Sequence, residues 1–268
     1  MGSWLRPPDV LETYDSRRED PSPENARRCR AIEDKAIAEL VQRQLNLGLR
    51  SITDGEFRRA MFFAQFIEGL EGGEQTYIAE MKFFVPITTG RLRWVKPVMV
   101  EDWRFVDNEI QKAGKGDVAF AKCVMPSPTM IHYGGATNTG KWINLTTYQL
   151  AKRGPKEGYT AAYNNDEELF QDLIQIYRSE LTALHEAGCR YVQFDDTVMA
   201  FLADPGERKI IEKAGDYTAD TLLDKYIWYV LVRLTYLRLF NECIDFPGRK
   251  DMTIVCHMCK VSTSLEFI

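Results

Sequence analysis

Helical and strand-like patterns alternate along the chain, and this alternation restricts the fold more than any other feature. Strand patterns lie near residues 1–5, 49–54, 118–125, 190–195 and 252–257. A repeated strand–helix order produces parallel strands with helices outside them. A closed barrel of this type needs eight units, so the sequence predicts an incomplete (β/α)8 TIM barrel with about five of eight units. Residues 1–268 are predicted to form a single domain.

Two local patterns refine this prediction. Ser22 and Pro23 are typical of a helix start, and helical spacing of apolar residues continues from there to Gly48. Residues 72–100 instead contain short strand patterns separated by Thr88, Thr89 and Gly90. We expect this region to be an irregular hairpin inserted over one end of the barrel.

Composition limits the classes of partner. The chain is 45% apolar and 27% charged with a net charge of −5, which is ordinary for a globular protein and unfavourable for a nucleic-acid surface. The aromatic stretch 228–237 is too short to span a membrane, so no membrane partner is expected. The N-terminus lacks the continuous apolar core of a secretion signal, which predicts a cytoplasmic protein with reduced cysteines.

Acidic side chains follow two of the predicted strands. Gln193 and Asp195 share one face of the strand ending at residue 195, whereas Asp196 points the other way. A carboxylate at the C-terminal end of a barrel strand favours a functional role for Asp195. Asp196 is expected to cap the next helix or to support the site. Glu56 follows Gly55, which permits a sharp turn, and is either a site residue or a solvated loop acid.

Hydroxyl groups lie at the same predicted rim. Ser3 ends the first strand pattern, and Ser127 and Thr129 flank Pro128 after the third. Ser3 is a candidate for binding a carboxylate. Ser127 and Thr129 either position a substrate or only form the turn. His132 and His185 have no partner in the sequence pattern, and a structural role is favoured for His185 within its helix.

His257 and Cys259 form the last candidate pair. Two residues apart on a strand, they point to the same side, and an imidazole beside a thiolate is half of a tetrahedral zinc site. The alternative is a histidine at a strand end beside a buried structural thiol.

Taken in order, these segments resemble the C-terminal-domain-like family of cobalamin-independent methionine synthase, within the uroporphyrinogen-decarboxylase/methionine-synthase-like superfamily. The segments that carry the resemblance are GSWLRP (2–7), TDGEFRR (53–59), MPSPT (125–129), AGCRYVQFDDT (187–197) and HMC (257–259). The resemblance extends from residue 2 to about residue 260.

The resemblance implies a zinc-dependent methyltransferase on a (β/α)8 barrel. It implies methyl transfer from a methylated folate to the thiol of homocysteine, giving methionine. His257 and Cys259 would be zinc ligands. Glu56 and Asp195 would bind the substrate ammonium, with Asp195 as the catalytic residue, and Ser3 would bind the substrate carboxylate. Ser127 and Thr129 would lie toward the methyl donor.

The chain also departs from the family pattern. The family's remaining zinc ligands, a Glu and a Cys on later strands, would follow residue 268, so we expect a truncated barrel with an incomplete zinc site. Residues 228–237 and 261–268 do not fit the pattern, and we hypothesise that they are translated intron sequence. Three alternatives remain open: a related thiol alkyltransferase, a decarboxylase on the same fold, and a non-catalytic remnant.

Overall fold

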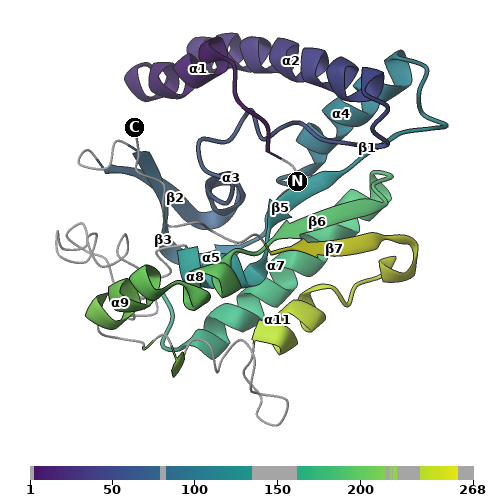
Figure 1. The fold of residues 1–268 in the computed structure, drawn as a ribbon. Coiled ribbons are helices and arrows are strands. Elements are labelled where there is room, and N and C mark those ends of the chain that lie inside the picture. Colours follow the sequence, from purple (N-terminus) through teal and green to yellow (C-terminus); the bar gives the residue numbers. More distant parts are fainter. Residues whose placement is uncertain are drawn as a thin grey trace.

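The computed structural model describes residues 3–78, 83–134, 162–214, 218, 220–221 and 236–258. They form a mixed α/β fold in which parallel strands and one antiparallel hairpin pack among helices (Figure 1). The strands are β1 (Ser51–Ile52), β2 (Glu71–Ile78), β3 (Phe83–Arg93), β4 (Phe120–Ala121), β5 (Cys123–Pro126), β6 (Tyr191–Asp195) and β7 (Thr253–His257). The helices are α1 (Pro8–Glu19), α2 (Pro23–Asn46), α3 (Ala64–Glu68), α4 (Val100–Lys112), α5 (Pro128–Gly134), α7 (Asp166–Glu186), α8 (Val198–Ala203), α9 (Pro205–Ala214), α11 (Tyr236–Cys243) and the 3-10 turn η1 (Arg249–Asp251).

The parallel strands follow one another in chain order. Strand β1 pairs with β4, and β5, β6 and β7 form a second parallel sheet in that order. Only Lys122 separates β4 from β5, so one run of chain belongs to both sheets. Neighbouring parallel strands joined by helices are the arrangement that the alternating pattern predicts. The parallel strand–helix organisation is therefore confirmed, whereas the barrel itself stays a prediction.

The first predicted strand is wrong in its described part. Residues 3–7 have no regular structure, and the backbone N–H of Trp4 donates to the carbonyl of Gly55 at 3.1 Å instead of entering a strand ladder. Pro7 and Pro8 have no N–H to donate, and Pro8 suits the first position of α1, a helix that the sequence analysis did not predict. The sequence analysis also did not predict the helix α9.

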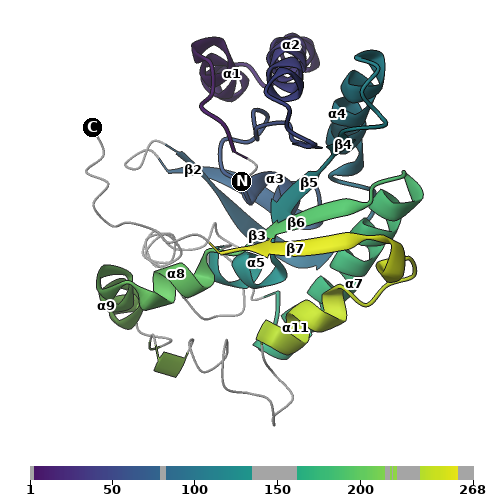
Figure 2. The same ribbon diagram turned by 45° about the vertical axis from the view of Figure 1, so that its right-hand side comes forward.

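Helices α7 and α11 cover one face of the sheet of β5, β6 and β7 (Figure 2). Phe194 of β6 packs against Tyr177 of α7 and Phe240 of α11, with ring centroids 5.6 and 5.2 Å apart. Because side chains alternate along a strand, Gln193 and Asp195 point to the opposite face. Burial of Phe194 thus fixes which strand residues line the polar side.

The predicted hairpin is confirmed, whereas its place over one end of a barrel stays a prediction. Strands β2 and β3 pair in antiparallel register, and the hairpin is attached to the rest of the fold at its base. Arg91 makes a bidentate ion pair with Asp172 of α7, and the N–H of Leu92 donates to the hydroxyl of Tyr163 at 2.7 Å. The predicted helix start at Ser22 is also confirmed, since its side chain accepts from the N–H of Asn25.

Three predictions concern residues outside the described ranges. Cys259 and the segments 228–235 and 261–268 belong to this group, while Tyr236 and Leu237 begin α11. Within the described part of the chain, no helix is both long enough and apolar enough to cross a membrane.

Candidate functional site

The segment after β1, residues 53–59, makes a turn that is uncommon for L-amino acids; we call it the Glu56 loop. Gly55 has φ +66° and Glu56 has φ +61°, so two successive residues lie in the left-handed region. A glutamate adopts this conformation only when its surroundings enforce it, and such residues cluster at functional sites. The enforcing contacts are backbone ones: Asp54 accepts from the N–H of Glu56 at 3.0 Å, and Arg6 donates to its carbonyl at 3.3 Å.

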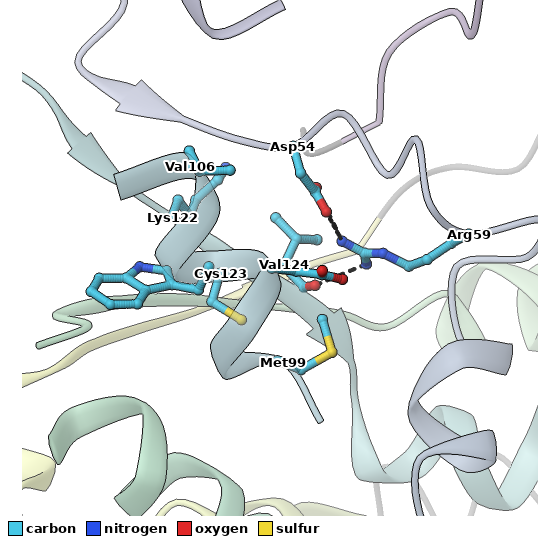
Figure 3. A pocket seen from close by; sticks show the side chains of 9 residues that line it. Asp54, Arg59, Met99, Val106, Lys122, Cys123 and Val124 are labelled. Carbon is cyan, nitrogen blue, oxygen red and sulfur yellow. Dashed lines mark hydrogen bonds and ion pairs between the residues drawn. The ribbon is translucent and has the colours of Figure 1, made fainter. Parts of the chain in front are cut away.

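A buried ion pair holds the Glu56 loop against β5. The guanidinium of Arg59 donates to both oxygens of Asp54 at 3.1 and 3.0 Å and to the carbonyl of Val124 at 2.9 Å (Figure 3). Burial opposes ionisation of Asp54, but the charge of Arg59 and the hydrogen bonds outweigh it and lower the pKa of that carboxyl. The ion pair therefore consists of a charged aspartate and a charged arginine, and it holds the Glu56 loop in place.

Arg58 is engaged elsewhere. Its guanidinium lies 2.5 Å from Asp34 and 3.2 Å from Asp102, and it is almost fully buried. Arg58 and Arg59, which follow Glu56 in the sequence, thus both have carboxylate partners within the fold.

Asp195 lies at the end of a chain of hydrogen-bonded side chains. As expected from strand alternation, Gln193 shares its face and donates from Nε2 to Oδ1 of Asp195 at 2.6 Å. Lys122 donates to Oε1 of Gln193 at 2.9 Å. The sequence analysis did not identify Lys122, although a single lysine within an apolar strand was the available signal. Burial raises the pKa of Asp195, and the Gln193 hydrogen bond and the charge of His257 oppose this only in part.

Glu56 and Asp195 come close enough to affect each other. Glu56 is only 3% exposed, so the alternative of a solvated loop acid is wrong. Burial raises the pKa of Glu56, repulsion from Asp195 and Asp54 adds to this, and Arg59 opposes it. Two buried carboxyl groups that are difficult to ionise together are a favourable place for a cation.

The hydroxyls of Ser127 and Thr129 are turned into the protein. Both side chains are buried and share a hydrogen bond of 2.7 Å. Ser127 accepts from the N–H of Met130, and Thr129 donates to Oδ2 of Asp196 at 2.5 Å. The other oxygen of Asp196 accepts from the N–H of Val198 at the start of α8, which is the capping role predicted for it. These contacts favour the turn-forming alternative for Ser127 and Thr129.

The N-terminal segment lies over the Glu56 loop. Besides the Trp4 hydrogen bond to Gly55, Arg6 donates to the carbonyl of Arg59 at 2.8 Å. Tyr14 donates to the same carbonyl from α1. Ser3 is exposed and directly precedes Trp4 in the sequence. The role of Ser3 as a ligand for a carboxylate stays a prediction.

His257 reaches the same rim from β7. It is the register partner of Asp195, and its carbonyl accepts from the N–H of Asp196 at 2.9 Å. The described part of the chain contains no group of three or more His, Cys, Asp and Glu side chains that could hold a metal ion. Since Cys259 lies outside that part, the described residues supply one predicted zinc ligand and do not form a zinc site by themselves.

The other two histidines have acidic neighbours that the sequence pattern did not reveal. His132 is buried in α5, with Nε2 3.4 Å from Oδ1 of Asp166. His185 lies 3.7 Å from Asp251 and packs against Phe246. These surroundings are consistent with the structural role favoured for His185.

Comparison with known protein families and proteins finds relatives of similar sequence. No protein-family model matches the chain. The chain is 31% identical to the uncharacterized protein YxjH of Bacillus subtilis over 270 residues, covering 97% of this chain and 60% of YxjH. It is 30% identical to the uncharacterized protein YxjG of the same organism, covering 88% of this chain and 54% of YxjG. The chain therefore spans less than two thirds of either relative.

Two solved structures share the fold. One is a protein of Listeria monocytogenes provisionally named a vitamin-B12-independent methionine synthase, with a TM-score of 0.65, 29% identity, and coverage of 97% of this chain and 64% of that protein. The other is a B12-independent methionine synthase of Shewanella sp. W3-18-1 in complex with selenomethionine. It has a TM-score of 0.54 and 18% identity, covers 87% of this chain and 53% of that protein, and supports the fold alone.

Proposed function

We propose that this chain belongs to a zinc-dependent methyltransferase of the cobalamin-independent methionine synthase type. The reaction would transfer a methyl group from a methylated folate to the thiol of homocysteine and release methionine. The observation that carries the proposal is that Glu56 and Asp195, which come from distant segments, are both buried and repel each other electrostatically. The likeness to the L. monocytogenes protein supports the same type of activity.

The two carboxylates suit the ammonium group of an amino acid. Burial and the charge of the neighbouring carboxylate both disfavour ionisation of each acid. The positive charge of a bound ammonium would offset both effects. We assign Glu56 and Asp195 to the ammonium, with Asp195 as the catalytic residue that positions the substrate. We assign the exposed Ser3 to the substrate carboxylate. Ser127 and Thr129 are assigned to the wall toward the methyl donor. There the hydrogen bond from Thr129 to Asp196, with Ser127 bonded to Thr129, would support Asp195 indirectly.

A zinc site is part of the proposal, but the described residues supply only one of its proposed ligands, His257. His257 and Cys259 are proposed as two of its ligands, and a catalytic zinc site normally has at least three protein ligands. When bound, zinc would hold the acceptor sulfur as a thiolate. The test is zinc content per protomer after purification, compared with Cys259→Ser and His257→Ala. Absence of zinc from the unmodified chain would contradict this part of the proposal.

The ammonium site can be tested by binding alone. L-methionine and L-homocysteine are compared by calorimetry with their analogues that lack the amino group. We expect the chain to prefer the amine-bearing ligands, and Glu56→Gln and Asp195→Asn to remove the preference. Loss of a buried charge partner costs about 2 kcal/mol or more, which is at least roughly 30-fold in affinity.

Matched controls separate a local effect from a general change in charge. Glu39, with a side chain 71% exposed, and Asp245, with one 84% exposed, provide the same substitutions on the surface. Glu39→Gln and Asp245→Asn should leave the affinities unchanged. Equal binding of ligands with and without the amine would contradict the proposal. Amine-dependent binding without methyl transfer from methyltetrahydrofolate would instead identify the related thiol alkyltransferase or a non-catalytic remnant.

A further inference from the structure

Lys122 occupies an unusual place in the fold. It is the single residue between β4 and β5, and its neighbours Ala121 and Cys123 are buried. Burial lowers the pKa of the Lys122 ammonium, and the charge of Asp195 partly opposes this. An ammonium in such a position is retained at a cost, so its contacts call for an explanation.

The Lys122 ammonium is linked to Asp195 through a single amide. Its Nζ lies 2.9 Å from Oε1 of Gln193, and Nε2 of Gln193 lies 2.6 Å from Oδ1 of Asp195. Gln193 is 5% exposed. Val124 lies opposite Gln193 in the sheet register. Lys122 is two residues from Val124 and Asp195 is two residues from Gln193, so Lys122, Gln193 and Asp195 lie on the same face. We call Lys122, Gln193 and Asp195 the polar relay.

The chemistry of the three groups permits one arrangement only. An ammonium can only donate and a carboxylate can only accept, whereas a primary amide does both, from different atoms. Lys122 and Asp195 therefore select the same orientation of the Gln193 amide, with its oxygen toward the lysine and its nitrogen toward Asp195. Without the lysine, the amide would be held from the Asp195 side alone and could turn away from the carboxylate. Lys122 thus anchors the Gln193 amide from the side opposite to Asp195.

The polar relay engages one oxygen of Asp195 and not the other. Among the described residues, the hydrogen bond of the Asp195 side chain is the one from Gln193 to Oδ1. We infer that Lys122 is a positioning residue, which acts through Gln193 to hold the Asp195 carboxylate so that Oδ2 is presented to the ligand ammonium. This inference rests on the proposed function, because it assumes that Asp195 binds a cation.

The first test is independent of any ligand. In the unmodified protein, the side-chain amide protons of Gln193 should give nuclear magnetic resonance signals shifted by the short hydrogen bond to Asp195. Lys122→Met, which keeps the length of the side chain but removes the charge and the donors, should move these signals toward ordinary values. Lys122→Arg, which keeps both, should preserve most of the shift. Unchanged signals in Lys122→Met would overturn the inference.

The second test measures affinity for L-methionine and for its analogue without the amino group. Lys122→Met should weaken binding of L-methionine by about 5- to 10-fold and leave binding of the analogue unaffected. The effect is modest because the lost charge-assisted hydrogen bond acts on Asp195 only through Gln193. In the Gln193→Leu background the same substitution should have no further effect, because the connection passes through the amide. Lys35→Met, on a side chain 78% exposed, is the matched control.

The outcomes distinguish the two levels of the argument. If the unmodified protein binds both ligands equally, the proposed ammonium site fails, and the inference fails with it. If the unmodified protein prefers the amine and Asp195→Asn removes that preference while Lys122→Met does not, only the role of Lys122 is refuted. An equal loss of affinity for both ligands in Lys122→Met would point to general disruption and would also refute the positioning role.

Discussion

Replacement of Arg59 by methionine should destabilise the protein far more than an ordinary surface change. The Arg59 and Asp54 side chains are 2% and 7% exposed, and Arg59 donates two hydrogen bonds to that carboxylate. Removing one partner of a buried pair leaves an uncompensated charge and costs about 3–5 kcal/mol. Asp54→Asn should cost a comparable amount, because it leaves the guanidinium of Arg59 without its counter-charge.

Urea unfolding at neutral pH measures these costs in a double-mutant cycle. The Asp54→Asn/Arg59→Met double variant should lose less stability than the sum of the single variants, because neither charge is then left alone. Arg93→Met is the matched control, since Arg93 is 65% exposed and lies 3.5 Å from Glu71 at the surface. Its expected cost is below about 1 kcal/mol.

The pH dependence gives a second check on the same pair. The pKa of Asp54 is lowered in the folded protein, so its contribution is present above the unfolded value of about 3.9 and is lost as the pH falls through the lowered value. The cost of Arg59→Met should therefore shrink in acid. Additive single and double variants, or a cost for Arg59→Met no larger than that of Arg93→Met, would refute the view that this pair holds the Glu56 loop.

Two further substitutions test buried carboxylates. Glu180, fully buried, accepts from Trp94 Nε1 at 2.7 Å and from the N–H groups of Val98 and Met99 at 2.9 and 2.8 Å; Glu180→Gln replaces one acceptor oxygen by a donor and should cost about 2–4 kcal/mol in urea unfolding. Glu56→Gln should instead increase stability at neutral pH. Because the pKa of Glu56 is raised in the folded protein, its stabilising contribution is lost as the pH rises through that raised value. Thermal unfolding from pH 4 to 8 should show the gain from Glu56→Gln disappearing below the unfolded pKa of about 4.3. A constant difference between Glu56→Gln and the unmodified protein across that range would contradict the assignment of the shift.

The sequence was sufficient to locate residues whose position follows from strand periodicity. Alternation along β6 predicted that Gln193 and Asp195 share a face, and their hydrogen bond of 2.6 Å agrees. The same reasoning could not identify Lys122, because its partner is on another strand and the pairing of those strands depends on the register. Likewise, Arg59 was visible beside Glu56, but its pairing with Asp54 depends on a turn geometry that no periodicity describes.

Residue type predicted the rim hydroxyls but not their orientation. A serine or threonine after a strand can face a ligand or can hydrogen-bond the first turn of the next helix, and the residue types are the same for both. Ser127 is followed by Pro128, the first residue of α5, and its hydroxyl accepts from the N–H of Met130. The competition is decided by burial of this turn, which a single sequence does not reveal.

The two acidic pairs of the site follow a common division of roles. In the first pair, Asp54 binds Arg59 and the N–H of Glu56, and in the second, Asp196 binds Thr129 and the N–H that begins α8. The other member of each pair, Glu56 or Asp195, has a raised pKa and lacks an arginine partner of that kind. Asp54 and Asp196 therefore stabilise the turns, whereas ionisation is unfavourable at their neighbours Glu56 and Asp195. An amide at either position would avoid the cost of ionisation, so that cost needs a reason beyond folding. The cationic ligand proposed above for Glu56 and Asp195 would supply that reason, because a bound cation would favour the charged form of both acids.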